Sequence, residues 1–434
     1  MSELLARHRA VIPNWVGIYY DEPIEIVSGK GCRVTDAKGR SYLDFFAGIL
    51  TNMLGYDVPE VRDAVERQIA SGVVHTSTLY LIRGQVELAE KIARLSGIEN
   101  AKVFFTNSGT EANETALLAA LTARKASEVL AMRGSYHGRS FGAVSVTGNA
   151  AWKMSSLNPF GTHYLHGTDR QQSPYKNLSD ADYVKACVED LRALLAGGVH
   201  PADVGCLLAE PVQGVGGFTM PPDGLFAAYK EVLDEHGILL ISDEVQTGWG
   251  RTGEHFWGIS AHGVTPDAMT FAKGLGNGFA IGGVVARGDL LDGIRGNGIS
   301  TFGGNPLATA AGNATLDYVL SHDLQRNAAV TGGLIINGLR EAARDTAIVG
   351  EVRGKGLMFA VDLIDPATRQ PSPPLAGRML EATRERGLLI GKGGLFGHTL
   401  RMAPPLTLSE AEAKEGLTIL TDALHTVNQE ATAR

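Results

Sequence analysis

Two charged residues, Asp243 and Lys273, each follow a short apolar segment of this 434-residue sequence and provide its first chemical signal. A carboxylate or an amine at the end of a buried strand needs a partner of opposite charge or a shifted pKa. An uncharged lysine amine is also the nucleophile that forms a Schiff base with a carbonyl group. One ligand would suit both residues: an aromatic aldehyde bonded to Lys273, with Asp243 beside its protonated ring nitrogen. A structural charge explains either residue taken alone.

A third segment, TNSGTEANETALLAALTARKA, predicts an anion-binding turn followed by a helix rich in Ala and Leu. The backbone N–H groups of Ser108, Gly109 and Thr110 would face an anion from the start of that helix. Ser108 or Thr110 acting as a plain helix N-cap is the alternative for this segment alone. We expect the turn to anchor a phosphate group of the same ligand.

The elements that position these residues follow from the spacing of apolar residues. Short apolar runs begin near residues 101, 128, 204, 238 and 268, and each ends in a polar or glycine-rich turn. Runs of this length, separated by helical stretches, predict an α/β fold with a mostly parallel central sheet buried on both faces. Ligands of such sheets bind at the carboxyl ends of the strands, which is where the polar residues named above lie.

Helical spacing predicts amphipathic helices in two early segments and near the C-terminus. The early patterns consist of Val61, Ala64, Val65 and Ile69, and of Val86, Ala89, Ile92, Ala93 and Leu95. We expect a large domain over residues 76–330 that binds the ligand. A smaller α+β domain would then be formed by residues 1–75 together with residues 331–434.

Composition and charge argue against several other classes of protein. The net charge of −8, with no Lys/Arg-rich run, argues against a nucleic-acid partner. No signal segment and no run of eighteen apolar residues is found, so neither export nor membrane insertion is expected. The three cysteines, Cys32, Cys187 and Cys206, are scattered, which favours a reducing cytoplasm. His163 and His166 lack a third ligand nearby, so no metal site is expected.

The motifs together resemble the class III aminotransferases. The resemblance extends from VTDAKGRSYLDFFAGI to RMAPPL, and its most specific part is ISDEVQTGWGRTGEHFWG followed by PDAMTFAKGLGNG. It implies the fold type I of the pyridoxal-phosphate-dependent transferases, pyridoxal 5'-phosphate as cofactor, and a homodimer whose active sites are shared across the interface. Tyr56, in GYDVP, departs from the usual family Gly-His, which leaves the residues at the substrate entrance unassigned.

The resemblance also implies roles for individual residues. Lys273 would be the Schiff-base lysine and proton carrier, and Asp243 the partner of the ring nitrogen. The Ser108-Gly109-Thr110 turn would bind the phosphate, and Thr301 would reach the phosphate held by the neighbouring subunit. The ring would be contacted by four further residues: Tyr136, His137, Val245 and Gln246.

Substrate carboxylates call for arginine, because a guanidinium can donate two parallel hydrogen bonds, and the resemblance implies two candidates. Arg139 follows YHG, where the 4-aminobutyrate and ornithine members of the family place a carboxylate-binding arginine, and Arg401, in LRMAPPL, matches the family arginine for the α-carboxylate. Glu210 resembles the family glutamate that pairs with the second arginine when a donor lacks an α-carboxylate, so that the arginine does not stay buried and unpaired. The alternatives are a surface role for Arg139 and a structural ion pair between Arg401 and Glu210.

The expected activity is ping-pong transfer of an amino group from alanine or a β- or ω-amino acid to a keto acid such as pyruvate or glyoxylate. The segments EHFWGISAHGVTPDAMTFAKGLGNGFAIGGVV and TFGGNPLATAAG look more like alanine–glyoxylate and β-amino-acid:pyruvate aminotransferases, whereas HTSTLYLIRGQVELAEKIARL is similar to acetylornithine-type members. One alternative is a 4-aminobutyrate- or ornithine-type enzyme that uses 2-oxoglutarate. Others are a decarboxylase, racemase or aminomutase on the same fold, and a non-catalytic cofactor-binding protein. Trp15, Tyr19 and Tyr20 are candidates for the substrate entrance or for packing.

Overall fold

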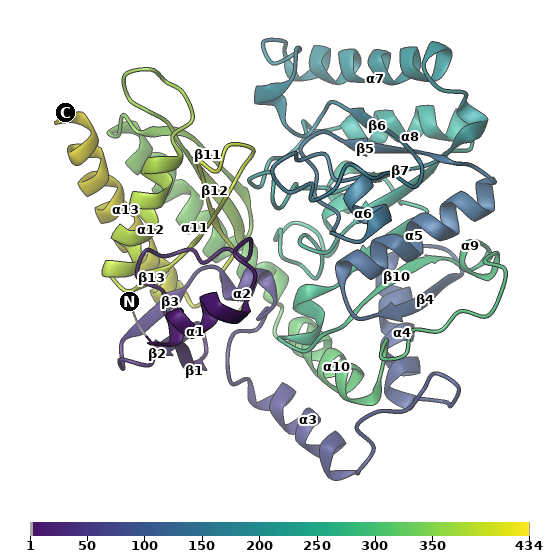
Figure 1. Cartoon of the computed structure of the whole chain (residues 1–434), viewed down its shortest axis with the longest axis horizontal. Coiled ribbons are helices and arrows are strands. Elements are labelled where there is room, and N and C mark those ends of the chain that lie inside the picture. The colour runs from purple at the N-terminus through teal and green to yellow at the C-terminus, as the bar shows by residue number, and fades with distance from the viewer. Residues whose placement is uncertain (1–2, 434) are drawn as a thin grey trace.

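The computed structural model describes residues 3–433, which form two lobes (Figure 1). The large lobe, on the right in Figure 1, is built on a seven-stranded sheet of order β4-β10-β9-β8-β7-β5-β6. Its strands are β4 (Ala101–Thr106), β5 (Glu128–Met132), β6 (Gly161–Leu165), β7 (Val204–Ala209), β8 (Leu239–Asp243), β9 (Ala268–Phe271) and β10 (Gly282–Arg287). Only β10 runs antiparallel to its neighbours. The expectation of a mostly parallel sheet is confirmed.

The sheet is buried on both faces, as the continuous apolar runs predicted. In β8, Leu239 and Ile241 belong to the core beneath α5 (Gly109–Arg124), whereas Leu240 belongs to the core on the opposite face. Successive side chains of a strand point to opposite faces, so one run of apolar residues serves both cores. The second core also contains residues of α7 (Asp180–Gly197) and α8 (Leu225–Glu235).

Two strands and one helix face differ from the expectations. The pattern did not predict β6, which carries polar residues, or β10, which begins with two glycines. The two early helices are present as α3 (Pro59–Ala70) and α4 (Arg83–Ser96). In α4, however, Val86 is 46% exposed and Leu88 is fully buried, so the buried face is rotated from the predicted one.

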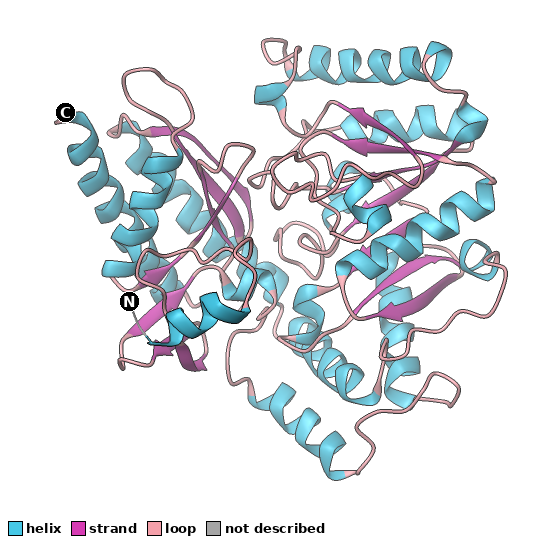
Figure 2. Ribbon diagram, viewed as in Figure 1, coloured by secondary structure: helices cyan, strands magenta, loops and turns pink. Residues whose placement is uncertain are grey.

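The small lobe contains both chain termini and two four-stranded sheets (Figures 1 and 2). One sheet has the order β1-β2-β3-β13 and the other β11-β12-β15-β14. The strands are β1 (Ile26–Lys30), β2 (Arg33–Asp36), β3 (Ser41–Asp44), β11 (Val349–Lys355), β12 (Met358–Leu363), β13 (Leu388–Leu389), β14 (Gly391–Gly393) and β15 (Thr399–Met402). The helices are α1 (Glu3–Val11), α2 (Ala47–Leu50), α11 (Leu324–Arg344), α12 (Pro373–Glu385) and α13 (Glu410–Thr432).

The C-terminal helix α13 begins with a reciprocal cap between Ser409 and Glu412, where each side chain bonds the backbone of the other. Further helices of the large lobe are α6 (Phe141–Ser145), α9 (Gly288–Asp292) and α10 (Pro306–Ser321). The domain boundaries near residues 75 and 330 stay predictions. No helix within residues 3–433 has the length and apolar character needed to cross a membrane.

Candidate active site

A cavity of about 180 Å³ lies at the carboxyl ends of the parallel strands of the large lobe. It brings together ten of the predicted residues: Gly109, Thr110, Tyr136, His137, Arg139, Glu210, Asp243, Val245, Gln246 and Lys273. Asn113 and Gly138 complete the lining. Ser108, Thr301 and Arg401 were also predicted and do not line this cavity.

Asp243 is the best-anchored acid of the cavity and is 4% exposed. Its Oδ2 accepts a hydrogen bond from Asn113 Nδ2 at 2.8 Å and lies 2.8 Å from His137 Nδ1. Its Oδ1 accepts from the backbone N–H of Val245 at 3.1 Å. A carboxylate has about four acceptor positions, so one position, on Oδ1, remains for a donor in the cavity.

His137 supports Asp243 through a defined tautomer. Its Nε2 is buried and has no partner within residues 3–433, whereas Nδ1 faces the Asp243 carboxylate. A proton on Nδ1 therefore gives the ring its one available hydrogen bond, as a donor to Asp243. His137 thus both lines the cavity and contacts Asp243, and its predicted place beside the ring of the ligand stays a prediction.

Asn113 is a site residue that the sequence reasoning missed. It lies one turn into α5, is 1% exposed, and donates both to Asp243 and to the His137 carbonyl. Its Oδ1 accepts from Thr270 Oγ1 at 2.7 Å, which ties β9 to the same network. An asparagine on the buried face of an Ala/Leu-rich helix was the available signal, since buried polar groups require partners.

Lys273 follows β9 and begins a short 3₁₀ turn with a φ of 45°. Positive φ is uncommon for a residue with a Cβ and is often found at functional sites. Burial lowers the pKa of Lys273, against the charges of Asp243 and Glu210, and the Arg401 charge lowers it further. Nζ is therefore more readily uncharged, as Schiff-base formation requires.

The predicted phosphate turn begins α5. Ser108 is the N-cap, and its side chain accepts from the Glu111 backbone N–H, so the simple capping role is realised. The first N–H groups of an α-helix have no acceptor within the helix, which leaves those of Gly109 and Thr110 for an anion. The Thr110 hydroxyl bonds Ser140 Oγ at 2.6 Å and holds the loop that carries Arg139.

Gln246 and Glu210 both line the cavity and both contact Gly214. Gln246 is 8% exposed and its Oε1 is buried without a partner within the described chain. Gly214 packs directly on this side chain, because an added Cβ would lie 1.8 Å from Gln246 Nε2. The Glu210 carboxylate accepts from the backbone N–H groups of Tyr136 and Gly214, and burial raises its pKa to about 7.

Arg401 lies behind the cavity wall and is 2% exposed. Its Nη1 donates to the Gly214 carbonyl at 2.9 Å and its Nε to the Lys392 carbonyl at 3.2 Å. The rings of Phe46 and Phe218 lie 5.4 and 5.6 Å from the guanidinium carbon, in cation–π range. No ion pair joins Arg401 to Glu210 within residues 3–433, and both instead bond Gly214.

Arg139 and Thr301 occupy exposed positions. Arg139 reaches the cavity from the loop after Gly138, and its guanidinium forms no ion pair within the described chain. Thr301 lies in the loop before α10 and does not line the cavity of its own chain. Tyr136 does line the cavity, and its ring packs edge-on against Trp152 at 5.5 Å.

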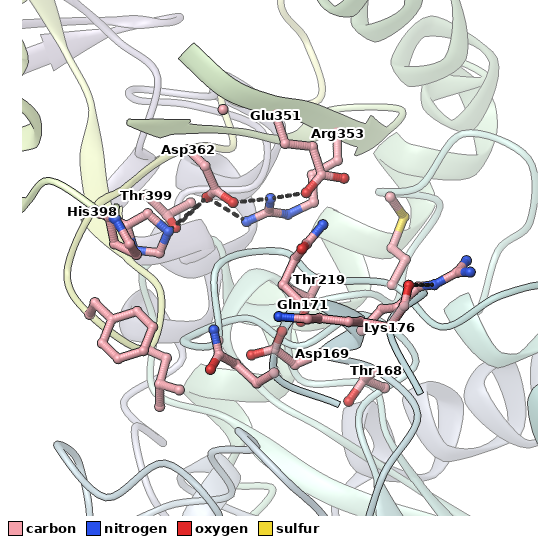
Figure 3. Close-up of a pocket in the computed structure, with 18 of the residues that line it drawn as sticks. Thr168, Asp169, Gln171, Lys176, Thr219, Glu351, Arg353, Asp362, His398 and Thr399 are labelled. Atoms are coloured by element: carbon pink, nitrogen blue, oxygen red, sulfur yellow. Dashed lines mark hydrogen bonds and ion pairs between the residues drawn. The ribbon is translucent and has the colours of Figure 1, made fainter. Parts of the chain in front are cut away.

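A second and larger cavity, of about 580 Å³, lies between the lobes and contains none of the predicted site residues (Figure 3). On its wall, Arg353 of β11 bonds Asp362 and Glu351, and Thr399 bonds Asp362. Arg353 also donates to the Gly217 carbonyl from two nitrogens. The loop 214–217 is therefore held at one end by Arg353 and at the other by Arg401.

Comparison with known proteins places this arrangement in a family. Residues 19–424 match the family model described as Aminotransferase class-III. The chain belongs to the class III aminotransferases. This aminotransferase is 36% identical to alanine–glyoxylate aminotransferase 2 homolog 2 of Arabidopsis thaliana, over 94% of its own length and 84% of the relative's. It is 37% identical to acetylornithine aminotransferase of Mycolicibacterium smegmatis, over 98% and 99% of the two chains.

Solved structures agree with the family assignment. An (S)-enantioselective omega-transaminase from Thermomicrobium roseum superposes with a TM-score of 0.90 at 33% identity, covering 98% of each chain. The relatives also include an alanine/serine racemase of Pyrococcus horikoshii, 33% identical over 98% of this chain and 90% of the relative. The predicted fold type I and the predicted enzyme class are confirmed.

Pyridoxal 5'-phosphate is the cofactor of this aminotransferase, and the residues of the cavity fit it. The unpartnered Gln246 Oε1 offers a hydrogen-bond acceptor inside the cavity. The free acceptor position on Asp243 Oδ1 suits a protonated ring nitrogen, and the start of α5 suits a phosphate. Within residues 3–433, no cluster of His, Cys, Asp or Glu has the composition of a metal site.

Proposed function

We propose that this aminotransferase moves the amino group of alanine, or of a β- or ω-amino acid, to a short keto acid such as pyruvate or glyoxylate. The observation that supports this choice most is the buried Arg401, whose charge acts on Lys273 and whose guanidinium forms no ion pair with a carboxylate within residues 3–433. The alanine–glyoxylate relative supports the same substrates. The cytoplasmic location stays a prediction.

Lys273 performs the central steps in this proposal. Its Nζ would hold the cofactor through the aldehyde carbon and, once released by the donor amine, would be free to act as a base. Neutral Nζ would then take the proton from the substrate carbon and hold it for return on the cofactor side. The pyridine ring, when bound, would supply the electron sink for the carbon that loses its proton. Water would release the product keto acid, and an acceptor keto acid would reverse the proton transfer at Nζ.

Asp243 and the residues around it hold the ring in its reactive protonation state. A negative charge on Oδ1 would favour a proton on the ring nitrogen, and the contacts of Asn113 and His137 with Oδ2 fix the orientation of the carboxylate. Val245 packs on Gly109, where an added Cβ would lie 3.0 Å from Val245 Cγ2. We assign Val245 to the ring face, Tyr136 to the opposite face, and Gln246 to the ring hydroxyl.

A second candidate function is a 4-aminobutyrate- or ornithine-type reaction with 2-oxoglutarate. Arg139 favours it, since an exposed guanidinium at the cavity, free of ion pairs within residues 3–433, can bind a second carboxylate. The same enzyme fold supports racemisation, which needs no keto acid.

A panel of donors and acceptors tests these assignments. Alanine, β-alanine and 4-aminobutyrate are each mixed with pyruvate, glyoxylate or 2-oxoglutarate, and the new amino acid is quantified. Turnover with pyruvate or glyoxylate supports the proposal, whereas turnover with 2-oxoglutarate alone overturns it in favour of the second candidate, and R139A should then abolish the reaction. A transaminase given a donor without a keto acid stops after one turnover, whereas a racemase continues.

We also propose a homodimer in which Thr301 of one subunit contacts the cofactor phosphate of the other. Thr301 is followed by Phe302, which is 57% exposed and contacts His75. Shortly after His75 in the sequence, Leu79 and Leu81 are 75% and 98% exposed. An apolar surface of this kind is typical of a protein interface. Mixing subunits of K273A and T301D, each inactive alone, should restore about a quarter of the activity, because random pairing creates dimers with one intact site. No restoration from a mixed dimer contradicts the shared site.

A further inference from the structure

The helix α2 (Ala47–Leu50) is a single left-handed turn. Its four residues have positive φ, at 48°, 63°, 65° and 63°, and only Gly48 lacks a Cβ. A left-handed turn costs each residue with a Cβ on the order of 1–2 kcal/mol. Such a conformation persists only where the surrounding structure holds it, and it is found most often at functional sites.

Asp44 and Tyr56 stabilise this turn through hydrogen bonds. Asp44 Oδ1 accepts from the backbone N–H groups of Phe46 at 2.8 Å and Ala47 at 3.0 Å. Asp44 Oδ2 accepts from the Tyr56 hydroxyl at 2.6 Å. Tyr56 is itself fixed, because its backbone pairs with Gly31 and its ring packs on Gly29, where an added Cβ would lie 2.6 Å away.

The turn lies next to the surroundings of both Arg401 and Lys273. Phe46, at its start, places its ring 5.4 Å from the Arg401 guanidinium carbon. The same ring fills the space left by Gly391, the residue paired with Arg401 across β14 and β15. At the other end of the turn, the Leu50 carbonyl is 3.3 Å from where a Cβ on Gly274, the neighbour of Lys273, would lie.

We propose that Asp44 and Tyr56 form a positioning pair that sets the Phe46 wall of the Arg401 site and thereby the preference for substrates with a carboxylate. The inference rests on the proposed role of Arg401 in binding that carboxylate. Neither member of the pair lines the active-site cavity, so the pair acts through Phe46 and not on the substrate. The proposal also assigns a role to Tyr56, the residue that departs from the usual family Gly-His.

A tyrosine suits this role because it stays a neutral donor. Burial raises the pKa of Tyr56, and the neighbouring Asp44 raises it further. The hydroxyl therefore keeps its proton at physiological pH. A histidine at the same position would titrate near neutrality, and its bond to Asp44 would change with pH.

The test compares two donors that differ only in the carboxylate: alanine, and ethylamine, which is alanine without that group. The holoenzyme is mixed with each donor, and the loss of cofactor absorbance in a single half-reaction gives the apparent second-order rate constant. For Y56F, the ratio of the alanine constant to the ethylamine constant should fall about tenfold, as expected for the loss of one hydrogen bond of an anchoring group. D44N, which disturbs the same anchor, should lower the ratio in the same direction.

Y42F is the matched control. Tyr42 is also buried in the small lobe and donates to an aspartate, Asp36, at 2.9 Å, but within residues 3–433 its hydroxyl forms no hydrogen bond with Asp44 or the turn. Its ratio should stay within about twofold of the wild type. A merely structural effect would slow both donors equally and leave the ratio unchanged. R401Q separates the two possible failures. If R401Q lowers the ratio but Y56F and D44N leave it unchanged, the inference about the Asp44–Tyr56 pair is overturned. If R401Q also leaves the ratio unchanged, the proposed role of Arg401 fails instead.

Discussion

Asn113 Nδ2 donates to Asp243 Oδ2 over 2.8 Å, which joins α5, one turn after its start, to the end of β8. The same amide group donates to the His137 carbonyl, and the amide oxygen accepts from Thr270. One asparagine thus connects three strand ends and orients the acid that faces the cofactor. Its position makes Asn113 a sensitive point for cofactor binding.

Replacing Asn113 with alanine should weaken cofactor binding. The change removes one hydrogen bond to the Asp243 carboxylate, a loss of about 1.5–3 kcal/mol for a bond to a charged group. The dissociation constant of pyridoxal 5'-phosphate, measured by titrating the apoenzyme, should rise at least about tenfold. Asn313 is the control, since it donates to the carbonyls of Gly84 and Thr309 away from the cavity. N313A should lower stability without changing that constant, and equal effects of the two variants would contradict the assignment.

Lys273→Ala should remove both the Schiff-base absorbance and the turnover. Among the described residues that line the cavity, Lys273 is the only lysine, so the variant lacks the side-chain amine that forms the Schiff base. Loss of a proton-transferring group costs about 10²–10⁴-fold in rate, and the measurement is the formation of product amino acid. Far-ultraviolet circular dichroism checks that the variant is folded. A folded K273A enzyme that kept its absorbance would disprove the role of Lys273.

Glu210 predicts a pH dependence of stability. Because its pKa in the folded protein is about 7, above the ordinary value of 4.5, the folded state binds the proton more tightly than the unfolded chain. The contribution of protonated Glu210 to the free energy of unfolding is fully present below pH 4.5 and is lost as the pH rises through 7. E210Q lacks this titration. The free energy of unfolding of E210Q minus that of the wild type should therefore increase by about 1–3 kcal/mol from pH 5 to pH 8. Urea unfolding at several pH values measures the difference, and parallel curves would refute it.

Gly217→Ala should loosen the contact between the lobes. Gly217 has a φ of 104°, and an added Cβ would lie 3.0 Å from Thr399 Oγ1 and 3.1 Å from Arg353 Nη2. Gly224 is the control, with a φ of 84° and open space around the added Cβ. Both variants suffer backbone strain, but G217A should lose about 1–2 kcal/mol more, because it also presses on the Arg353 network. Thermal unfolding measures both, and an equal loss would show that the close approach is unimportant.

The prediction of this site from the sequence was possible because its chemistry sits at strand ends. Asp243, Lys273 and the turn at Ser108 each follow a short apolar run, and parallel strands bring such ends to one edge of the sheet. Their convergence therefore depends on the topology alone. The sequence predicted five of the seven strands of that sheet, and it missed β6 and β10, whose polar residues and glycines interrupt the apolar pattern.

The sequence by itself determined the strand ends, their polar residues and hence the fold class and the family of this enzyme, because local apolar patterns and short motifs carry that information. Tertiary structure alone decided that Asn113 bonds Asp243, that Arg401 lies between Phe46 and Phe218, and that Glu210 bonds Gly214 rather than Arg401. The Asn113 and Arg401 contacts join residues far apart in the chain, and although Glu210 and Gly214 are only four residues apart, the separation of Glu210 from Arg401 depends on distant segments. No local pattern encodes these relationships, since the first depends on how α5 packs on the sheet and the others on how the two lobes pack together.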